Sequence, residues 1–375
     1  MDKGQLTTDK LGLLIPNDEL KRLLKEDAEK KEPEFKAYCK SDKTLFEKNA
    51  RLWQSRWRKK TLKREKMGYD KNPGKEWGSL LLEADAKAGY NFYEGFGIRE
   101  AVENDHPRAD PDRKFNDVNN IWQNLLRSQH IPFNMFIPLY EGKGKDNKYF
   151  INIINDILEK KIIDNSDKKK NRMINKIEDF KIEHKPPKKE KRKYLNDDTS
   201  FDTYIEYTSI DDRRCIIGIE MKYTEGCSFA YSTKSYEKYK KVTNDSGAYE
   251  KCFEDLEKNF KDKKYNQIWR NHLLGESILL KDKEDKEKDE DKKFKEFISI
   301  TIYPEGNEHI GGNERIRKAT DFAKFLNEEN KYKCLFITYE ELFKLFKNHC
   351  PNEQYKHWID WMEKRYIVNF KDYPL

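Results

Sequence analysis

The stretch GIEMKYTEG, residues 218–226, places a glutamate and a lysine two positions apart in a segment that otherwise favours a β-strand. Side chains of a strand alternate between its two faces. The odd positions 217, 219, 221 and 223 then form a continuous apolar face, whereas the even face turns polar at Glu220 and Lys222. Such a charged pair on a half-buried strand is either a surface ion pair or part of an active site.

The preceding segment FDTYIEYT, residues 201–208, has the alternation of a second strand. The connection between the two contains consecutive aspartates, which favour a tight turn, so we expect a hairpin. A turn centred on Asp211 sets Asp202 opposite Glu220 and beside Lys222. A shift of one residue would move Asp202 to the other face, so this register is an assumption of the prediction.

Two acids and a lysine on one face suggest a particular chemistry. Facing carboxylates repel one another unless a cation lies between them, and hard oxygen ligands suit Mg²⁺ or Mn²⁺. Such an ion polarises a phosphate oxygen and lowers the pKa of a bound water. The lysine could orient that water or stabilise the charge that develops on the phosphate. Asp202, Glu220 and Lys222 are therefore candidate catalytic residues, and a surface hairpin with one Lys–Glu pair is the alternative.

The composition restricts the class of protein. Of the 375 residues, 36% are hydrophobic, 39% charged and 13% aromatic, and this aromatic content is untypical of a disordered chain. The net charge of +7 is compatible with a nucleic-acid partner. No long apolar run or signal-peptide core is present, so we expect a cytoplasmic protein without a membrane partner. The six cysteines lack C-x-x-C spacing, which disfavours a zinc knuckle or a disulfide scaffold.

Other catalytic classes find no support in the sequence. It contains no G-x-x-x-x-G-K-[ST] phosphate loop, no H-E-x-x-H and no G-x-S-x-G elbow. The histidines are scattered and none is paired at metal-ligand spacing.

Strand patterns alternate with helical patterns in the second half of the chain. Strands are predicted at 201–208, 214–224, 297–303 and 334–339, with helices at 247–260, 265–280, 314–328, 340–348 and 353–366. This order predicts an α/β fold with a mixed central sheet flanked by helices. Helical patterns also cover 17–66, 119–129 and 149–162, and no strand is evident before Asp202.

Charge density suggests how the chain is divided. We expect a basic helical N-terminal extension at 1–75 and a second domain at 76–375 that contains the candidate residues Asp202, Glu220 and Lys222. Two charge-dense stretches, at 164–195 and 280–296, are interpreted as exposed insertions in that domain.

The end of the N-terminal extension is strongly basic, because seven of the eleven residues in RWRKKTLKREK, 56–66, are Arg or Lys. One interpretation is a helix docked through Trp53 and Trp57 with a solvated basic face. The other is a surface that follows a nucleic-acid backbone, since clustered cations release its counterions. The candidate nucleic-acid-binding residues are Arg56, Arg58, Lys59, Lys60, Lys63 and Arg64.

Four segments in order carry a resemblance to a known family. They are RSQHIPFNMFIPL (127–139), TSFDTYIEY (199–207), GIEMKYTE (218–225) and NQIWRNHLLGE (266–276). With D…E-x-K on adjacent strands, the chain resembles the PD-(D/E)xK nuclease superfamily over roughly residues 75–375, and within it a branch of bacterial nucleases. Phe201 stands where the superfamily has the proline, and 164–195 has no counterpart in the pattern.

The resemblance implies a restriction-endonuclease-like core and a metal-dependent endonuclease that cleaves DNA, with Mg²⁺ or Mn²⁺ as cofactor. Asp202, Glu220 and the carbonyl of Met221 would be metal ligands, and Lys222 the catalytic lysine. It also suggests restriction or anti-phage defence, with duplex rather than single-stranded DNA as the partner. Because duplex cleavage needs two scissions, a homodimer is a candidate assembly. The alternative function is an inactive nucleic-acid-binding protein with a nuclease fold.

Further residues of the four segments are candidates for supporting the site. Glu225 could shape it or hold a second metal. The others either line the cleft or serve packing alone, and they are Gln267, Arg270, Asn271, Gln129 and Asn134.

Overall fold

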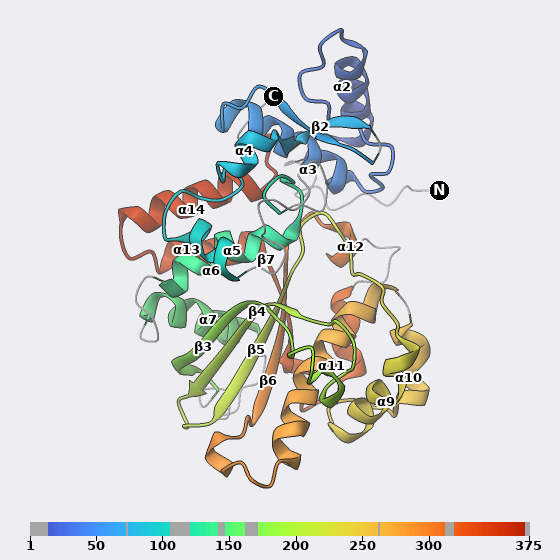
Figure 1. Ribbon diagram of the computed structural model, residues 1–375, viewed down its shortest axis with the longest axis vertical. Coiled ribbons are helices and arrows are strands. Elements are labelled where there is room, and N and C mark those ends of the chain that lie inside the picture. Colours follow the sequence, from blue (N-terminus) through green and yellow to red (C-terminus); the bar gives the residue numbers. More distant parts are fainter. Residues whose placement is uncertain are drawn as a thin grey trace.

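The structure is a computed structural model of the chain that describes residues 14–72, 74–105, 121–141, 147–161, 172–261, 263–311 and 319–371. At its centre lies a five-stranded sheet (Figure 1). Its strands, in spatial order, are β3 (Ile174–His184), β4 (Phe201–Ser209), β5 (Arg214–Met221), β6 (Glu296–Tyr303) and β7 (Cys334–Thr338). The first three are antiparallel neighbours, and β5, β6 and β7 run parallel. The predicted mixed sheet is confirmed.

The β4–β5 hairpin has the predicted register. Thr203 pairs with Ile219 and Tyr204 pairs with Gly218, so the next position sets Asp202 against Glu220. The turn closes with the Ser209 amide donating to the Arg213 carbonyl at 2.9 Å.

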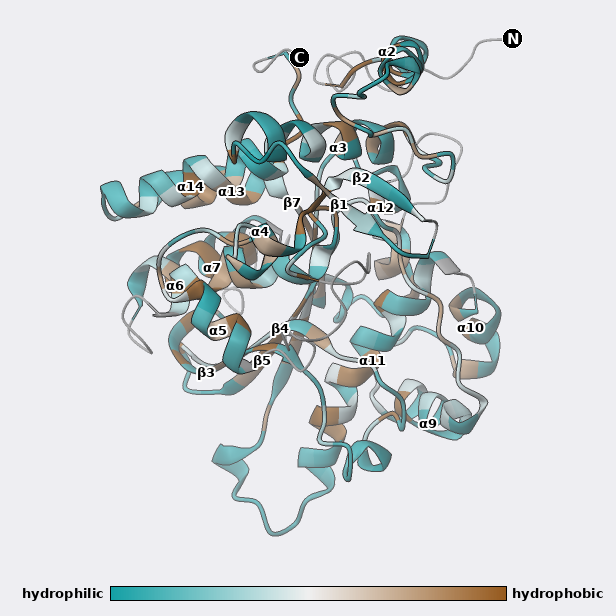
Figure 2. Cartoon of the chain, turned by 45° about the horizontal axis from the view of Figure 1, so that its top comes forward, coloured by the Kyte–Doolittle hydropathy of each residue, from teal (hydrophilic) through white to brown (hydrophobic). Residues whose placement is uncertain are grey.

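Helices cover both faces of the sheet (Figure 1). One face packs against α6 (Ile131–Glu141), α7 (Lys148–Lys161), α13 (Tyr339–Asn348) and α14 (Glu353–Tyr366). The other packs against α9 (Tyr236–Asp245), α10 (Phe253–Phe260) and α11 (Lys263–Glu284). Hydrophobic residues gather along the strands and the adjoining parts of these helices (Figure 2). None of the helices in the described ranges is long and apolar enough to cross a bilayer.

The N-terminal part is built onto this core rather than separate from it. It comprises α2 (Asn17–Glu29), α3 (Leu45–Arg56) with a π-helical turn at Trp57–Thr61, and a hairpin of β1 (Met67–Asp70) and β2 (Lys75–Leu81). Trp53 on α3 is buried in the main core and donates from Nε1 to the Arg365 carbonyl at 3.0 Å. The expected boundary at residue 75 falls at the start of β2.

The remaining elements are short. They are the helices α4 (Glu83–Lys87), α5 (Ile98–Asp105) and α12 (Glu308–Gly311), and 3₁₀ turns at Ser128–His130, Lys191–Lys193, Thr233–Ser235, Glu290–Lys292, Ala319–Phe325 and Lys331–Lys333.

Two sequence predictions about local structure are wrong. Residues 174–184, within the stretch 164–195 that was interpreted as an exposed insertion, form strand β3, the edge of the sheet next to β4, with Ile174 and Ile177 buried. The predicted helix at 119–129 is instead, over its described residues, an irregular segment beside β2. The backbone amide of Leu81 on β2 donates to the Gln123 carbonyl at 2.9 Å. In both cases tertiary pairing overrides the local pattern.

Gly275 provides a test of how closely α11 packs on the sheet. A Cβ at this position would lie 2.3 Å from ring atoms of Phe297, which is fully buried on β6. Helix propensity alone would favour alanine by about 0.5–1 kcal/mol. We expect Gly275→Ala to destabilise the protein instead, by about 1–3 kcal/mol, because the ring must move. Chemical denaturation measures this, with Lys283→Ala on the exposed side of α11 as control. A more stable Gly275→Ala would contradict the packing.

Candidate active site

The end of β5 that carries Glu220 opens into a cleft of about 1030 Å³. The start of β4, the loop after β5 and α11 form part of its wall. Residues of the N-terminal part and of the turn before α6 complete it. The lining includes Ser41, Lys43, Glu47, Arg127, Gln129, Glu183, Asp202, Glu220, Lys222, Glu225, Ser228, Phe229, Lys264, Gln267, Arg270, Asn271 and His309.

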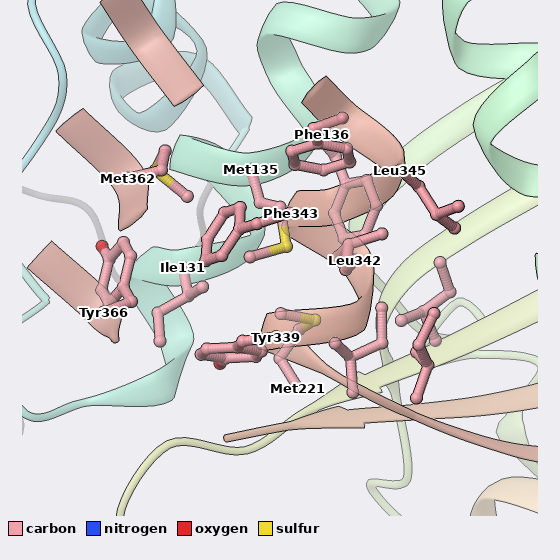
Figure 3. Packing of buried hydrophobic residues seen from close by; sticks show 14 of the residues in the cluster. Ile131, Met135, Phe136, Met221, Tyr339, Leu342, Phe343, Leu345, Met362 and Tyr366 are labelled. Atoms are coloured by element: carbon pink, nitrogen blue, oxygen red, sulfur yellow. The ribbon is translucent and has the colours of Figure 1, made fainter. Parts of the chain in front are cut away.

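The core on the far side of the sheet determines which way the motif points. Met221 inserts its side chain among Ile131, Met135, Phe343 and Tyr339 of the apolar cluster (Figure 3). Since neighbouring residues of a strand face opposite sides, the carboxylate and the ammonium on either side of Met221 point to the α11 side. Both lie in the cleft yet are almost fully buried, at 6% and 5% exposure.

Three donors surround the Glu220 carboxylate. Its Oε1 accepts from Lys222 Nζ at 2.6 Å and from Gln267 Nε2 at 2.6 Å. Its Oε2 accepts from Asn271 Nδ2 at 2.6 Å. These hydrogen bonds offset the free energy that a charge loses when it is removed from water. Gln267 and Asn271 lie four positions apart on one side of α11, so the helix supplies both amides at once.

Gln267 joins the motif to the loop after β5. Its Oε1 accepts from Lys222 Nζ at 2.9 Å and from the Ser228 amide at 2.6 Å. The amide group therefore has one fixed orientation, with Oε1 toward the two N–H donors and Nε2 toward Glu220. Arg270, also buried, donates to Thr199 Oγ1 at 2.8 Å and to Ser228 Oγ at 3.3 Å.

Asp202 completes the group from β4. Its Oδ2 accepts from the Met221 amide at 2.6 Å. Burial raises the pKa of Asp202 well above its ordinary value, and the negative charges of Glu220 and Glu183 raise it further. The Lys222 amide donates to Ile302 on β6, so the amide and carbonyl of Met221 point to the opposite edge of β5, the side of Asp202.

Lys222 keeps its proton in this setting. Burial alone would lower the pKa of Lys222, but the carboxylates around it, Glu220 foremost, more than offset this and raise the pKa. Its backbone is also fixed, because Tyr339 OH donates to the Lys222 carbonyl at 2.7 Å. At neutral pH the side chain is therefore an immobile cation rather than a base.

The donor set fits a hard divalent cation only in part. Two carboxylates and one backbone carbonyl are oxygen ligands of the type that Mg²⁺ and Mn²⁺ prefer. Burial and, after it, the charges of Glu220 and Glu183 raise the pKa of Asp202, and a bound cation would counteract this by favouring the ionised carboxylate. Within the described ranges, however, no three or more His, Cys, Asp or Glu side chains gather as a ready-made metal site. Any ion would therefore depend on Asp202, Glu220 and backbone or water oxygens.

The supporting candidates divide into two groups. Glu225, Gln267, Arg270, Asn271 and Gln129 all line the cleft. Asn134 does not. It is buried in α6, where its Oδ1 accepts from the Tyr93 amide at 2.9 Å and its Nδ2 donates to Tyr366 OH at 3.0 Å. Its contacts thus hold α6 to α14 and to the irregular segment around Tyr93, away from the cleft.

The basic N-terminal segment does not present all its cations to solvent. Arg58 is fully buried, and its guanidinium donates to the carbonyls of Gly78, Glu65 and Lys66 at 2.8–3.1 Å. The sequence prediction that Arg58 binds nucleic acid is wrong, because those hydrogen bonds hold the turn after α3. Lys59 and Lys60 both lie 3.3 Å from Glu34. None of the six candidates, Arg56, Arg58, Lys59, Lys60, Lys63 and Arg64, lines the cleft.

Sequence reasoning missed several residues of the cleft. Glu183 comes from β3, which was not recognised as a strand. Lys43 and Glu47 come from the segment before and within α3, and His309, which lies 3.2 Å from Glu47, comes from α12. Nothing in the local sequence indicates these residues, since only the tertiary fold brings them to the motif.

The raised pKa of Asp202 leads to a stability test. When folding raises the pKa of an acid, the folded protein becomes less stable as the pH increases above the pKa of that acid in the unfolded chain, which is ordinarily 3.8 for aspartate. Asp202→Asn is therefore expected to increase the free energy of unfolding at neutral pH in EDTA, with the gain disappearing below about pH 3.8. Chemical denaturation across a pH series measures this.

Asp211 in the hairpin turn is the matched control. Burial is the largest single effect and raises its pKa, but the hydrogen bonds from Ser209 and Arg213 and the charge of Arg213 together outweigh it, so the pKa of Asp211 is lowered. Asp211→Asn should thus have the opposite sign and lose stability at neutral pH. Equal losses in both variants would contradict the electrostatic description of the cleft.

Comparison with known proteins supplies the family. A family model described as PD-(D/E)XK nuclease superfamily matches residues 40–368. No curated protein gives a significant match, and no solved structure does either. The match covers most of the chain, and it includes β3 to β7 and the helices on both faces. The chain therefore belongs to the PD-(D/E)XK nuclease superfamily.

Proposed function

We propose that this nuclease-family protein is a metal-dependent endonuclease that hydrolyses DNA phosphodiester bonds at Asp202, Glu220 and Lys222. The observation that supports this most is the meeting of the buried Glu220, the half-buried Asp202 and a protonated lysine on one face of a hairpin, inside a single cleft. Groups with strongly shifted pKa values in a cleft are typical of catalytic sites. The family membership supports nucleic acid as the substrate.

In this proposal Asp202, Glu220 and the Met221 carbonyl hold a divalent ion, Mg²⁺ or Mn²⁺. When bound, that ion would polarise a phosphate oxygen and acidify a water molecule. The chain's own contribution is to fix the two carboxylates before substrate arrives. The Met221 amide holds the Asp202 carboxylate, and Asn271 holds one oxygen of Glu220.

Lys222 has a separate role in the proposed reaction. Because it stays protonated, it is suited to stabilise negative charge that develops on the phosphate, not to remove a proton from water. Gln267 and the Tyr339 hydroxyl, which bind its ammonium and its carbonyl, keep it in place without reorganisation during the reaction. They are positioning residues.

The finer features of the function are also proposals. Hydrolysis would leave a 5′-phosphate, as in the superfamily, and the substrate would be duplex DNA encountered in restriction or anti-phage defence. Two scissions on a duplex would be made by two copies of the chain. Glu225, which lines the cleft, is the candidate for shaping the site or holding a second ion.

Cleavage of supercoiled plasmid tests the proposed function. With Mg²⁺ or Mn²⁺ the wild type should nick or linearise the plasmid, and EDTA should stop it. Glu220→Gln and Lys222→Met should each reduce the rate by at least about 100-fold, the usual effect of removing one charge-stabilising group. Glu206→Gln is the control, since this acid lies on the same hairpin but pairs with Arg214 at 2.9 Å outside the cleft.

Two results would count against this function. One is cleavage by the Glu220→Gln or Lys222→Met protein at the wild-type rate. The other is salt-sensitive DNA binding without cleavage in any metal, which would favour the inactive nucleic-acid-binding protein.

A further inference from the structure

One aromatic side chain in the wall of the cleft is left half-exposed. Phe229 lies in the loop between β5 and α9, and 50% of its surface faces solvent. Nearby Tyr231 instead stacks on Trp269 of the core, with ring centroids 6.5 Å apart. Among the described residues the other large hydrophobic side chains of comparable exposure, Tyr38, Tyr69 and Ile210, do not line this cleft.

The backbone that carries Phe229 is held on both sides by α11. The Ser228 amide donates to Gln267 Oε1 at 2.6 Å, and the Ala230 amide donates to Asn266 Oδ1 at 3.1 Å. Arg270 adds a bond to Ser228 Oγ at 3.3 Å. The exposed ring is therefore presented by an anchored segment, which differs from an apolar residue on a loosely held loop.

The same anchor connects Phe229 to the motif. Gln267 Oε1 accepts both from Ser228, the neighbour of Phe229, and from Lys222 Nζ at 2.9 Å. A single amide group thus links the backbone next to Phe229 to the lysine. Phe229 and Lys222 line the same cleft, so a substrate whose phosphate meets Lys222 can reach this ring.

The other side chains of the cleft indicate which kind of ligand can stack on the Phe229 ring. Besides Lys222 and the buried Arg270, three cationic side chains line the same cleft and suit a phosphate backbone: Lys43, Arg127 and Lys264. A flat aromatic face next to such a surface binds a nucleic-acid base by stacking, which every base permits. A base can reach a protein side chain in this way only after leaving the helical stack.

We propose that Phe229 stacks on one base of the substrate, beside the phosphate that is cleaved, so that the protein acts where a nucleotide is unpaired or displaced from the duplex. This rests on the proposed nuclease function and specifies its substrate. Displacing a base costs least where it is already unpaired. The preferred substrate is then duplex DNA with an unpaired nucleotide at the site of cleavage.

Binding without cleavage tests this inference. Fluorescence anisotropy in EDTA, at one fixed salt concentration, compares a fully paired duplex with the same duplex carrying one bulged nucleotide. The wild type should bind the bulged duplex more tightly. Phe229→Ala should weaken that binding by roughly 5- to 150-fold, the range that corresponds to the loss of one base–aromatic stack, and should remove the preference.

Three variants make the test specific to stacking. Phe229→Leu keeps an apolar side chain without an aromatic face and should behave like Phe229→Ala, whereas Phe229→Trp should retain the preference. Tyr69→Ala removes an aromatic ring of similar exposure outside the cleft and should bind as the wild type does. Wild-type affinity in Phe229→Ala or in Phe229→Leu would overturn the inference, as would equal binding of both duplexes by the wild type.

The plasmid assay separates this inference from the proposed function. If the wild type cleaves plasmid and Phe229→Ala binds the bulged duplex normally, stacking is wrong and the nuclease proposal stands. If the wild type cleaves nothing in any metal but its preference depends on Phe229, stacking stands and the nuclease proposal fails.

Discussion

The antiparallel pairing of β4 with β5 is the constraint on which the site depends. It sets Asp202 against Glu220, and strand alternation then directs Lys222 to the same side. The register is fixed by burial, because a shift of one residue would bring Glu220 into the apolar cluster that now holds Met221 (Figure 3). The core that stabilises the fold therefore also orients the acidic group.

Helix α11 supplies the hydrogen bonds that the buried charges of Glu220 and Lys222 do not find within the sheet. Burying Glu220 and Lys222 removes two charges from water, at a cost that their mutual attraction offsets only with further hydrogen bonds. Gln267 and Asn271 provide those bonds, and Gly275 one turn further lets the helix approach Phe297 closely. The spacing of these residues on one helix explains why packing and electrostatics are satisfied together.

The β4–β5 hairpin at the centre of the site could be predicted because strand alternation and turn preferences depend only on neighbouring residues. Alternation and a two-aspartate turn predicted the hairpin and the face of Glu220, whereas the register of the hairpin was an assumption that the structure confirms. Strand β3 escaped prediction because irregularities near Ile174 and Ile177 break its alternation, and charges fill its exposed positions. Because β3 was not predicted, its residue Glu183 was not recognised as part of the cleft. Arg58 was misjudged for a different reason, since sequence does not show that backbone carbonyls surround a cation.

The central claim is that Asp202 and Glu220 together bind a divalent cation next to Lys222. The most direct measurement is the anomalous scattering of Mn²⁺ in crystals of the full chain, with and without Asp202→Asn. The account predicts one peak between the two carboxylates, close to the Met221 carbonyl, that is lost in the variant. A peak elsewhere, or none at millimolar Mn²⁺, would contradict it.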